Sequence, residues 1–306
     1  AGFANWMNRL AVGWFVLDQT DSAFLTTLTY TVQSAPGLLT APFGGAIADR
    51  VHRKSLLAFT TAVEGVVAFG LALVAVDGIE SVWPVVLLVG IAGTVNSLKT
   101  PATQALIPDL VGPRDAMNGI AIYSVGIRGV GVFGALSSGF VLELYGPVTV
   151  FAAAAALFAV ATVAFSRVNV ERRQADPDAP RTSIIQDTLE GIRVLLSLPT
   201  VRALLIIALL IEVLCYSFRS VLPVLARDRL GLDESGLGAL TAMGGFGSFL
   251  GALTLVALSE YGRKGRMLIL IAGLYGFGVL ALGASSVTWL SFGIITCVGI
   301  TAALFD

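Results

Sequence analysis

Residues 44–57 read GGAIADRVHRKSLL, and five ionisable side chains stand within positions 49–54 of this stretch, between two apolar runs. The whole chain of 306 residues is only 13% charged and 56% hydrophobic, with a mean hydropathy of +0.86. Soluble domains are about 45–50% apolar and about 25% charged. The composition therefore predicts a polytopic membrane protein, in which such a charged cluster is a loop at the membrane surface.

Ten apolar segments divide the sequence. They show continuous apolarity rather than the alternation of a transmembrane β-barrel, so the pattern favours helices and an all-α integral membrane fold. The first segment is short for a full span, and the chain starts and stops within apolar stretches, so we expect a fragment of a longer protein. The segments cover residues 1–18, 23–46, 55–76, 82–105, 117–142, 147–166, 200–225, 235–258, 266–285 and 287–305.

Basic residues are unevenly divided between the connecting loops. One alternate set of loops holds twelve Lys and Arg residues, and the other set holds only Arg227 and Arg229. Because basic loops stay on the cytoplasmic side, the first set is predicted to be cytoplasmic. The first helix then runs from inside to outside, in the cell's inner (plasma) membrane.

The longest polar connector divides the helices into two groups. We expect a bundle of six helices over residues 1–166, a cytoplasmic linker over 167–199, and a partial bundle of four helices over 200–306. Residues 184–199 carry apolar side chains at helical spacing, which indicates either an amphipathic helix on the inner membrane face or an ordinary packed surface helix. The stretch SEYGRKGR, residues 259–266, repeats the charged loop at the same place in the second group. Two tandem halves of this kind are typical of secondary transporters.

The stretch GGAIADRVHRK resembles the loop between the second and third helices of the major facilitator superfamily, G-x-L-A-D-R-x-G-R-R/K. His52 stands where glycine is usual. The stretches PATQALIPDLVGPRDAMNGIAIYS (101–124) and LPVLARDRLGLDESGLGALTAMGGFGSFLGAL (222–253) are similar to the branch that includes enterobactin and macrolide exporters. The resemblance implies two six-helix halves, of which about ten of twelve helices are present here.

The resemblance also implies an inner gate between the two halves. Its motif residues in this chain are Gly45, Asp49, Arg50, Arg53 and Lys54. An acid at a helix end can meet the positive N-terminal end of another helix and nearby arginines, and those contacts would break in the other conformation. The alternative is that these charges only anchor the topology, although Asp49 adds nothing to a positive-inside signal.

Charged groups inside the apolar segments are costly and indicate a functional site by default. Glu212 lies near the middle of its segment, and we expect it to exchange a proton or bind a cationic substrate. Arg219 follows seven residues later, on the same helical face. Arg128 lies in the glycine-rich stretch SVGIRGVGVFGALSSG and either attracts an anionic group in a central cavity or pairs with a carboxylate.

Further polar residues are candidates for the same cavity. Arg9 lies beside two asparagines on the first segment, and Tyr30, Gln33 and Asn96 are additional candidates; Lys99 either lines the cavity or snorkels to the inner face. Glu64 is expected to form an interhelical hydrogen bond rather than take part in transport.

Several chemistries have no support in the sequence. There is no P-loop, no HExxH motif, and the single histidine lies in a basic loop, so we expect no enzyme, cofactor or metal site. The net charge of −1 gives no field for nucleic acid, and the two cysteines are read as packing residues. We therefore predict a monomeric, proton-coupled exporter of a small organic molecule of drug, macrolide or siderophore type. An importer of the same fold is the alternative, followed by a non-transporting membrane scaffold.

Overall fold

The computed structural model describes residues 1–50, 53–78, 81–112, 114–167, 197–257 and 264–305. These residues are helical and contain no strand, and seven helices among them are long and apolar enough to cross a membrane by length and composition. The elements are α1 (Gly2–Thr20), α2 (Ala23–Arg50), α3 (Arg53–Asp77), α4 (Trp83–Val111), α5 (Ala116–Arg167), α7 (Pro199–Ile211), η1 (Glu212–Tyr216), α8 (Phe218–Val224), η2 (Leu225–Arg229), α9 (Glu234–Ala257), α10 (Lys264–Ala284) and α11 (Thr288–Phe305).

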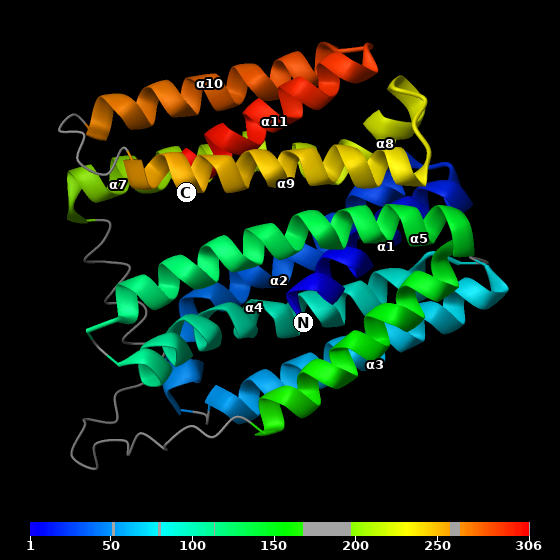
Figure 1. The fold of residues 1–306 in the computed structure, drawn as a ribbon, viewed down its shortest axis with the longest axis horizontal. Coiled ribbons are helices and arrows are strands. Elements are labelled where there is room, and N and C mark those ends of the chain that lie inside the picture. Colours follow the sequence, from blue (N-terminus) through cyan, green and yellow to red (C-terminus); the bar gives the residue numbers. More distant parts are fainter. Residues whose placement is uncertain (51–52, 79–80, 113, 168–196, 258–263, 306) are drawn as a thin grey trace.

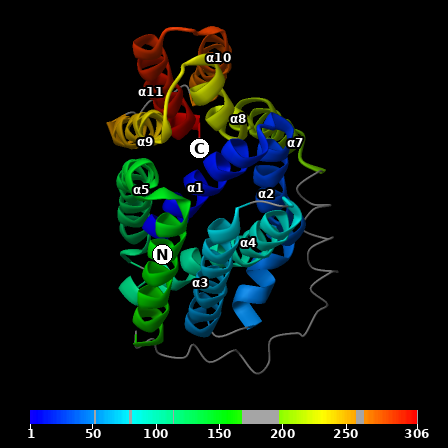
Figure 2. The same cartoon turned by 90° about the vertical axis from the view of Figure 1, so that its right-hand side faces the viewer.

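The helices form two bundles that lie one above the other in Figure 1. The first bundle is α1 to α5, and the second bundle is α7 to α11; Figure 2 shows the same two groups from the end of the molecule. Helices α5 and α9 pack against each other across the boundary, and so do α2 and α8. The predicted linker and amphipathic helix, residues 167–199, lie almost entirely outside the described residues, so the proposed boundaries stay predictions.

Two departures from regular α-helix reconcile these elements with the ten predicted segments. Helix α5 is two spans joined at Gly146, whose φ of 76° is left-handed and suits glycine, and Pro147 starts the second span. The run from α7 to η2 is one span interrupted by two π-helical turns, η1 and η2. The sequence predicts that segments 117–142 and 147–166 are separate and joined by the LYGP connector. The break at Gly146 lies in this connector and confirms the division.

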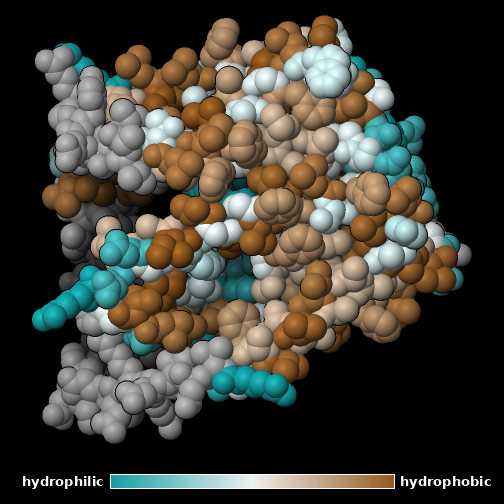
Figure 3. All heavy atoms as spheres, viewed as in Figure 1, coloured by the Kyte–Doolittle hydropathy of each residue, from teal (hydrophilic) through white to brown (hydrophobic). Residues whose placement is uncertain are grey.

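The outer surface of both bundles is apolar. Figure 3 shows hydrophobic side chains spread over the face toward the viewer, across helices of both bundles. Large side chains such as Val66, Leu280 and Trp289 are 70%, 75% and 86% exposed. In water a continuous surface of this kind would be unstable, whereas lipid chains cover it without cost. The fold thus has the surface of a membrane protein.

Glycines allow the two bundles to approach closely at one place. A Cβ atom added to Gly139 of α5 would lie 2.8 Å from the Gly238 Cα of α9, and 2.6 Å from the Glu234 carbonyl oxygen. No side chain fits there, so the two backbones are in direct contact. This contact lies near the end of the molecule where α1 ends and α9 begins, which we call the Asp21 end.

Candidate functional site

A cavity of 210 Å³ lies between the two bundles, and we call it the central cavity. Helices α1, α2 and α5 of the first bundle line it, together with α8, α9 and α11 of the second. Most of its walls are apolar or glycine, with Thr241 and Ser248 as hydroxyl groups on α9. A cavity shared by two bundles changes its shape and its openings when the bundles move relative to each other.

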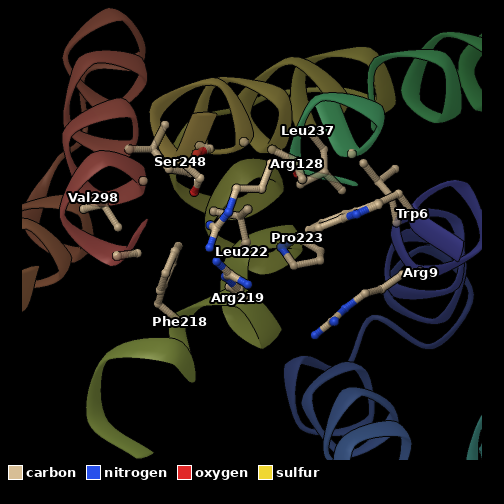
Figure 4. Close-up of a pocket in the computed structure, with 18 of the residues that line it drawn as sticks. Trp6, Arg9, Arg128, Phe218, Arg219, Leu222, Pro223, Leu237, Ser248 and Val298 are labelled. Carbon is tan, nitrogen blue, oxygen red and sulfur yellow. Dashed lines mark hydrogen bonds between the residues drawn. The ribbon is translucent and has the colours of Figure 1, made fainter. Parts of the chain in front are cut away.

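Three arginines reach into the central cavity from three helices. Arg9 comes from α1, Arg128 from α5 and Arg219 from α8. Figure 4 shows the side chains of Arg128 and Arg219 pointing toward the same central space, with Arg9 directed at it from the side of α1. Among the described residues that line this cavity, these three carry the only ionisable charges. Arg9, Arg128 and Arg219, each predicted separately as a cavity residue, therefore line the same cavity.

Aromatic rings complete the wall around the arginines. Trp6 packs on α5 where a Cβ added to Gly131 would lie 2.8 Å from the Trp6 ring nitrogen, and this contact holds the ring at the cavity wall. Tyr30 of α2 donates a hydrogen bond to the Arg9 carbonyl oxygen at 3.1 Å, and the Arg9 guanidinium lies 5.5 Å from the centre of its ring. Phe218 lines the opposite wall beside Arg219. The cavity thus pairs positive charge with flat apolar surfaces.

A second cavity of 140 Å³ lies inside the first bundle, and we call it the bundle cavity. Gln33 and Asn96, both predicted as cavity residues, line it with Asn5, Asn8 and Arg9. Asn8 is 6% exposed, and its Oδ1 atom has no hydrogen-bond partner in the structure. Arg9 lines both cavities, so one side chain connects them.

A buried ion pair borders the bundle cavity. Lys99 Nζ of α4 lies 2.5 Å from Glu64 Oε2 of α3, with side-chain exposures of 14% and 2%. Asn5 Nδ2 donates to the other carboxylate oxygen at 3.4 Å. The predicted interhelical hydrogen bond of Glu64 is confirmed. Lys99 does not snorkel to the membrane surface, because the Glu64 carboxylate satisfies its charge within the bundle.

Polar contacts join the two bundles at the Asp21 end. Arg227 Nη2 of η2 lies 2.5 Å from Asp21 Oδ1, and its Nη1 donates to the Leu17 carbonyl oxygen at 3.1 Å. Trp14 Nε1 of α1 donates to Glu234 Oε1 of α9 at 3.0 Å. Together with the glycine contact of α5 and α9, these bonds hold the two bundles together at the Asp21 end.

Glu212 lies apart from both cavities. Its side chain is exposed and is not among the described residues that line either one. The expectation that Glu212 and Arg219 share a face is wrong in this structure. A spacing of seven is two turns of α-helix, but Glu212–Tyr216 forms a wider π-helical turn, with hydrogen bonds to the fifth residue rather than the fourth. The predicted proton role of Glu212 stays a prediction.

The charged loop is described only in part. Gly45, Asp49 and Arg50 belong to the last turns of α2, and the placement of the Asp49 and Arg50 side chains is not described. Arg53 Nη1 donates to Asp109 Oδ2 at 2.5 Å and to the Ala105 carbonyl oxygen at 2.7 Å. These two partners are on α4, in the same bundle, so they fix α3 against α4. The predicted gate between the bundles, including the part of Lys54 in it, stays a prediction.

Sequence reasoning missed several residues of the two cavities. Trp6 lies three residues before Arg9, on the same side of a helix, so helical spacing could have indicated it. Phe218 directly precedes Arg219. By contrast, Trp14 and Glu234 are 220 positions apart and their pairing has no local signal.

An all-helical chain with an apolar exterior and a cavity between two bundles has the architecture of a membrane transporter. A family model described as Major Facilitator Superfamily matches residues 1–305. The chain belongs to the major facilitator superfamily, a family of multi-pass membrane transporters that bind small-molecule substrates. The resemblance that the charged loop indicates is thereby confirmed.

Two relatives that are named by the compound they transport are distant in sequence. The chain is 23% identical over 303 residues to the staphyloferrin A transporter of Staphylococcus aureus (strain NCTC 8325 / PS 47), covering 97% of this chain and 74% of the relative. It is 27% identical over 271 residues to the enterobactin exporter EntS of Shigella boydii serotype 4 (strain Sb227), covering 89% of this chain and 64% of the exporter.

A solved structure shares the fold. The crystal structure of a D-xylose-proton symporter matches with a TM-score of 0.67 at 16% identity, covering 99% of this chain and 78% of the symporter. At this identity the likeness shows the fold alone.

Proposed function

We propose that this protein is a secondary active transporter that exports a small organic molecule by alternating access, driven by protons. The observation that carries the proposal is the central cavity, whose wall is divided between two bundles that touch at the Asp21 end. Rocking of the bundles about such a cavity exposes it to each side of the membrane in turn. The excess of basic residues in the opposite loops supports an orientation with the Asp21 end outside, and in that orientation this arrangement is closed toward the outside.

The export direction is supported by the relative that is named an exporter and by the composition of the cavity. One relative is named an exporter of enterobactin and the other a transporter of staphyloferrin A, both siderophores. The central cavity has few hydroxyl or amide side chains of the kind that bind sugars, because the amides of α1, α2 and α4 line the bundle cavity instead. Import remains the alternative, and the direction of flux decides between them.

The test is transport in everted membrane vesicles that contain the protein expressed from its full gene. Labelled organic molecules are added outside, and a proton gradient is established by respiration. We expect at least one compound to accumulate and to leave again when a protonophore collapses the gradient. Accumulation that persists without the gradient would contradict proton coupling, and accumulation in right-side-out vesicles only would favour import.

The proton pathway is tested separately at Glu212. Glu212→Gln removes the titratable group while keeping the size of the side chain. If Glu212 carries the proton, the variant loses the dependence of transport on pH. An unchanged pH profile removes Glu212 from the pathway without affecting the proposal that the protein is a transporter.

A further inference from the structure

We infer that the central cavity binds a small organic anion with a flat aromatic part, held by Arg9, Arg128 and Arg219. The inference rests on the proposed function, since it assigns the substrate class of that transporter. The first argument is the free-energy cost of placing charged side chains within the membrane. Each charged side chain at membrane depth is unfavourable, and three of one sign around one space repel each other. A chain that keeps all three gains from them when an anion occupies the space.

Arginine is suited to this task by its geometry. The guanidinium is planar and offers five N–H donors, so it binds a carboxylate or phosphate through two parallel hydrogen bonds. Arg128 lines the cavity from α5, where its donors can face a ligand. Arg9 is positioned by the Tyr30 ring beneath its guanidinium.

The aromatic walls define the rest of the ligand. Trp6 and Phe218 line the cavity from opposite bundles, on either side of Arg128 and Arg219 (Figure 4). Flat apolar groups bind well between aromatic rings, and anions of aromatic acids combine both features. A volume of 210 Å³ limits the cavity, in this state, to small ligands.

The arrangement also connects binding with the movement of the bundles. Arg9 and Arg128 belong to the first bundle and Arg219 to the second. An anion between them attracts the arginines of both sides, whereas like charges on the two sides repel each other. The ligand therefore has a higher affinity for the arrangement that brings the arginines together, which is the requirement for a ligand to shift a conformational equilibrium.

The experiment compares acids with their own amides on the purified full-length protein in detergent. The probes are 2-naphthoate, benzoate and phthalate, each paired with its neutral amide, and binding is measured by calorimetry. We expect at least one acid to bind at least tenfold more tightly than its amide. This comparison uses the unaltered protein, so it does not depend on the folding of a variant. Equal affinities within each pair, or no binding by any acid at millimolar concentration, would overturn the inference.

Two variants then locate the binding site. Arg128→Gln and Arg219→Gln should each weaken binding of the acid at least tenfold and leave binding of the amide unchanged. Arg202→Gln is the matched control, since Arg202 is exposed on α7 and lines neither cavity. Equal weakening by all three variants would overturn the inference. Anion binding without any flux would contradict the transporter function alone, and flux of neutral compounds with no preference for acids would contradict this inference alone.

Discussion

Replacing Lys99 by methionine should destabilise the first bundle strongly. The Glu64 carboxylate is 2% exposed and lies 2.5 Å from the Lys99 ammonium, so it would remain buried with only the 3.4 Å hydrogen bond from Asn5. Removing one partner of a buried ion pair costs about 3–5 kcal/mol, since an uncompensated charge stays behind. An exposed pair would cost about 1 kcal/mol or less. Because both side chains are largely buried, we expect the larger loss of about 3–5 kcal/mol.

The assay is reversible unfolding of the purified protein in mixed micelles of detergent and SDS. The double variant Glu64→Met with Lys99→Met removes both charges, and we expect it to recover most of the loss, because apolar residues of similar volume replace a buried pair at little cost. Arg202→Met on α7 is the control at an exposed position and should change the free energy of unfolding by about 0.5 kcal/mol or less. A loss below about 1 kcal/mol for Lys99→Met, or a double variant whose loss equals the sum of the single ones, would refute this reasoning.

Three further predictions concern the movement of the bundles. Gly139→Ala should force α5 away from α9 and open the Asp21 end. The measurement is maleimide labelling of a cysteine placed at the start of α9, which should become faster. Gly126→Ala is the control and should leave the labelling rate unchanged, because no atom lies within 4 Å of its added Cβ. Asp21→Asn removes the negative charge that pairs with Arg227 from a side chain that is 86% exposed. The same labelling should therefore show at most an about fivefold shift in the equilibrium, and a larger one would contradict a surface contact. Asp49→Asn should slow transport while the protein still inserts in the membrane, and normal turnover would exclude the inner gate.

Many individual residues of the site could be predicted from the sequence. Which of them lie together in one cavity could not. The cost of charge in lipid singles out Arg9, Arg128 and Arg219, because that cost depends only on the residue type and its depth. Their convergence on one cavity depends on how α1, α5 and α8 pack, and no local pattern records that packing. The pairing of Glu64 with Lys99 was likewise visible only as two separate charges.

The π-helical turn shows a different limit. Seven residues separate Glu212 from Arg219, and regular α-helix would place them on one face. The turn η1 changes the hydrogen-bond register between them, and its sequence, EVLCY, contains neither proline nor glycine to mark the change. The helical face on which Arg219 lies relative to Glu212 therefore depends on the backbone conformation of η1. Residue spacing, which assumes a regular α-helix, gives the wrong face. The Gly146–Pro147 break, by contrast, was predictable because both residues resist a continuous helix.

The placement of charge between the two cavities has a consequence for the transport cycle. Glu64 and Lys99 lie within one bundle, so a rocking motion of whole bundles leaves their bond intact in every state. Arg219 lies across the boundary from Arg9 and Arg128, so the same motion changes the distances among the three charges. Loss of the Glu64–Lys99 bond should therefore weaken all conformations alike and leave their ratio unchanged. Loss of the Arg219 charge should change that ratio, since only this charge moves relative to the other two.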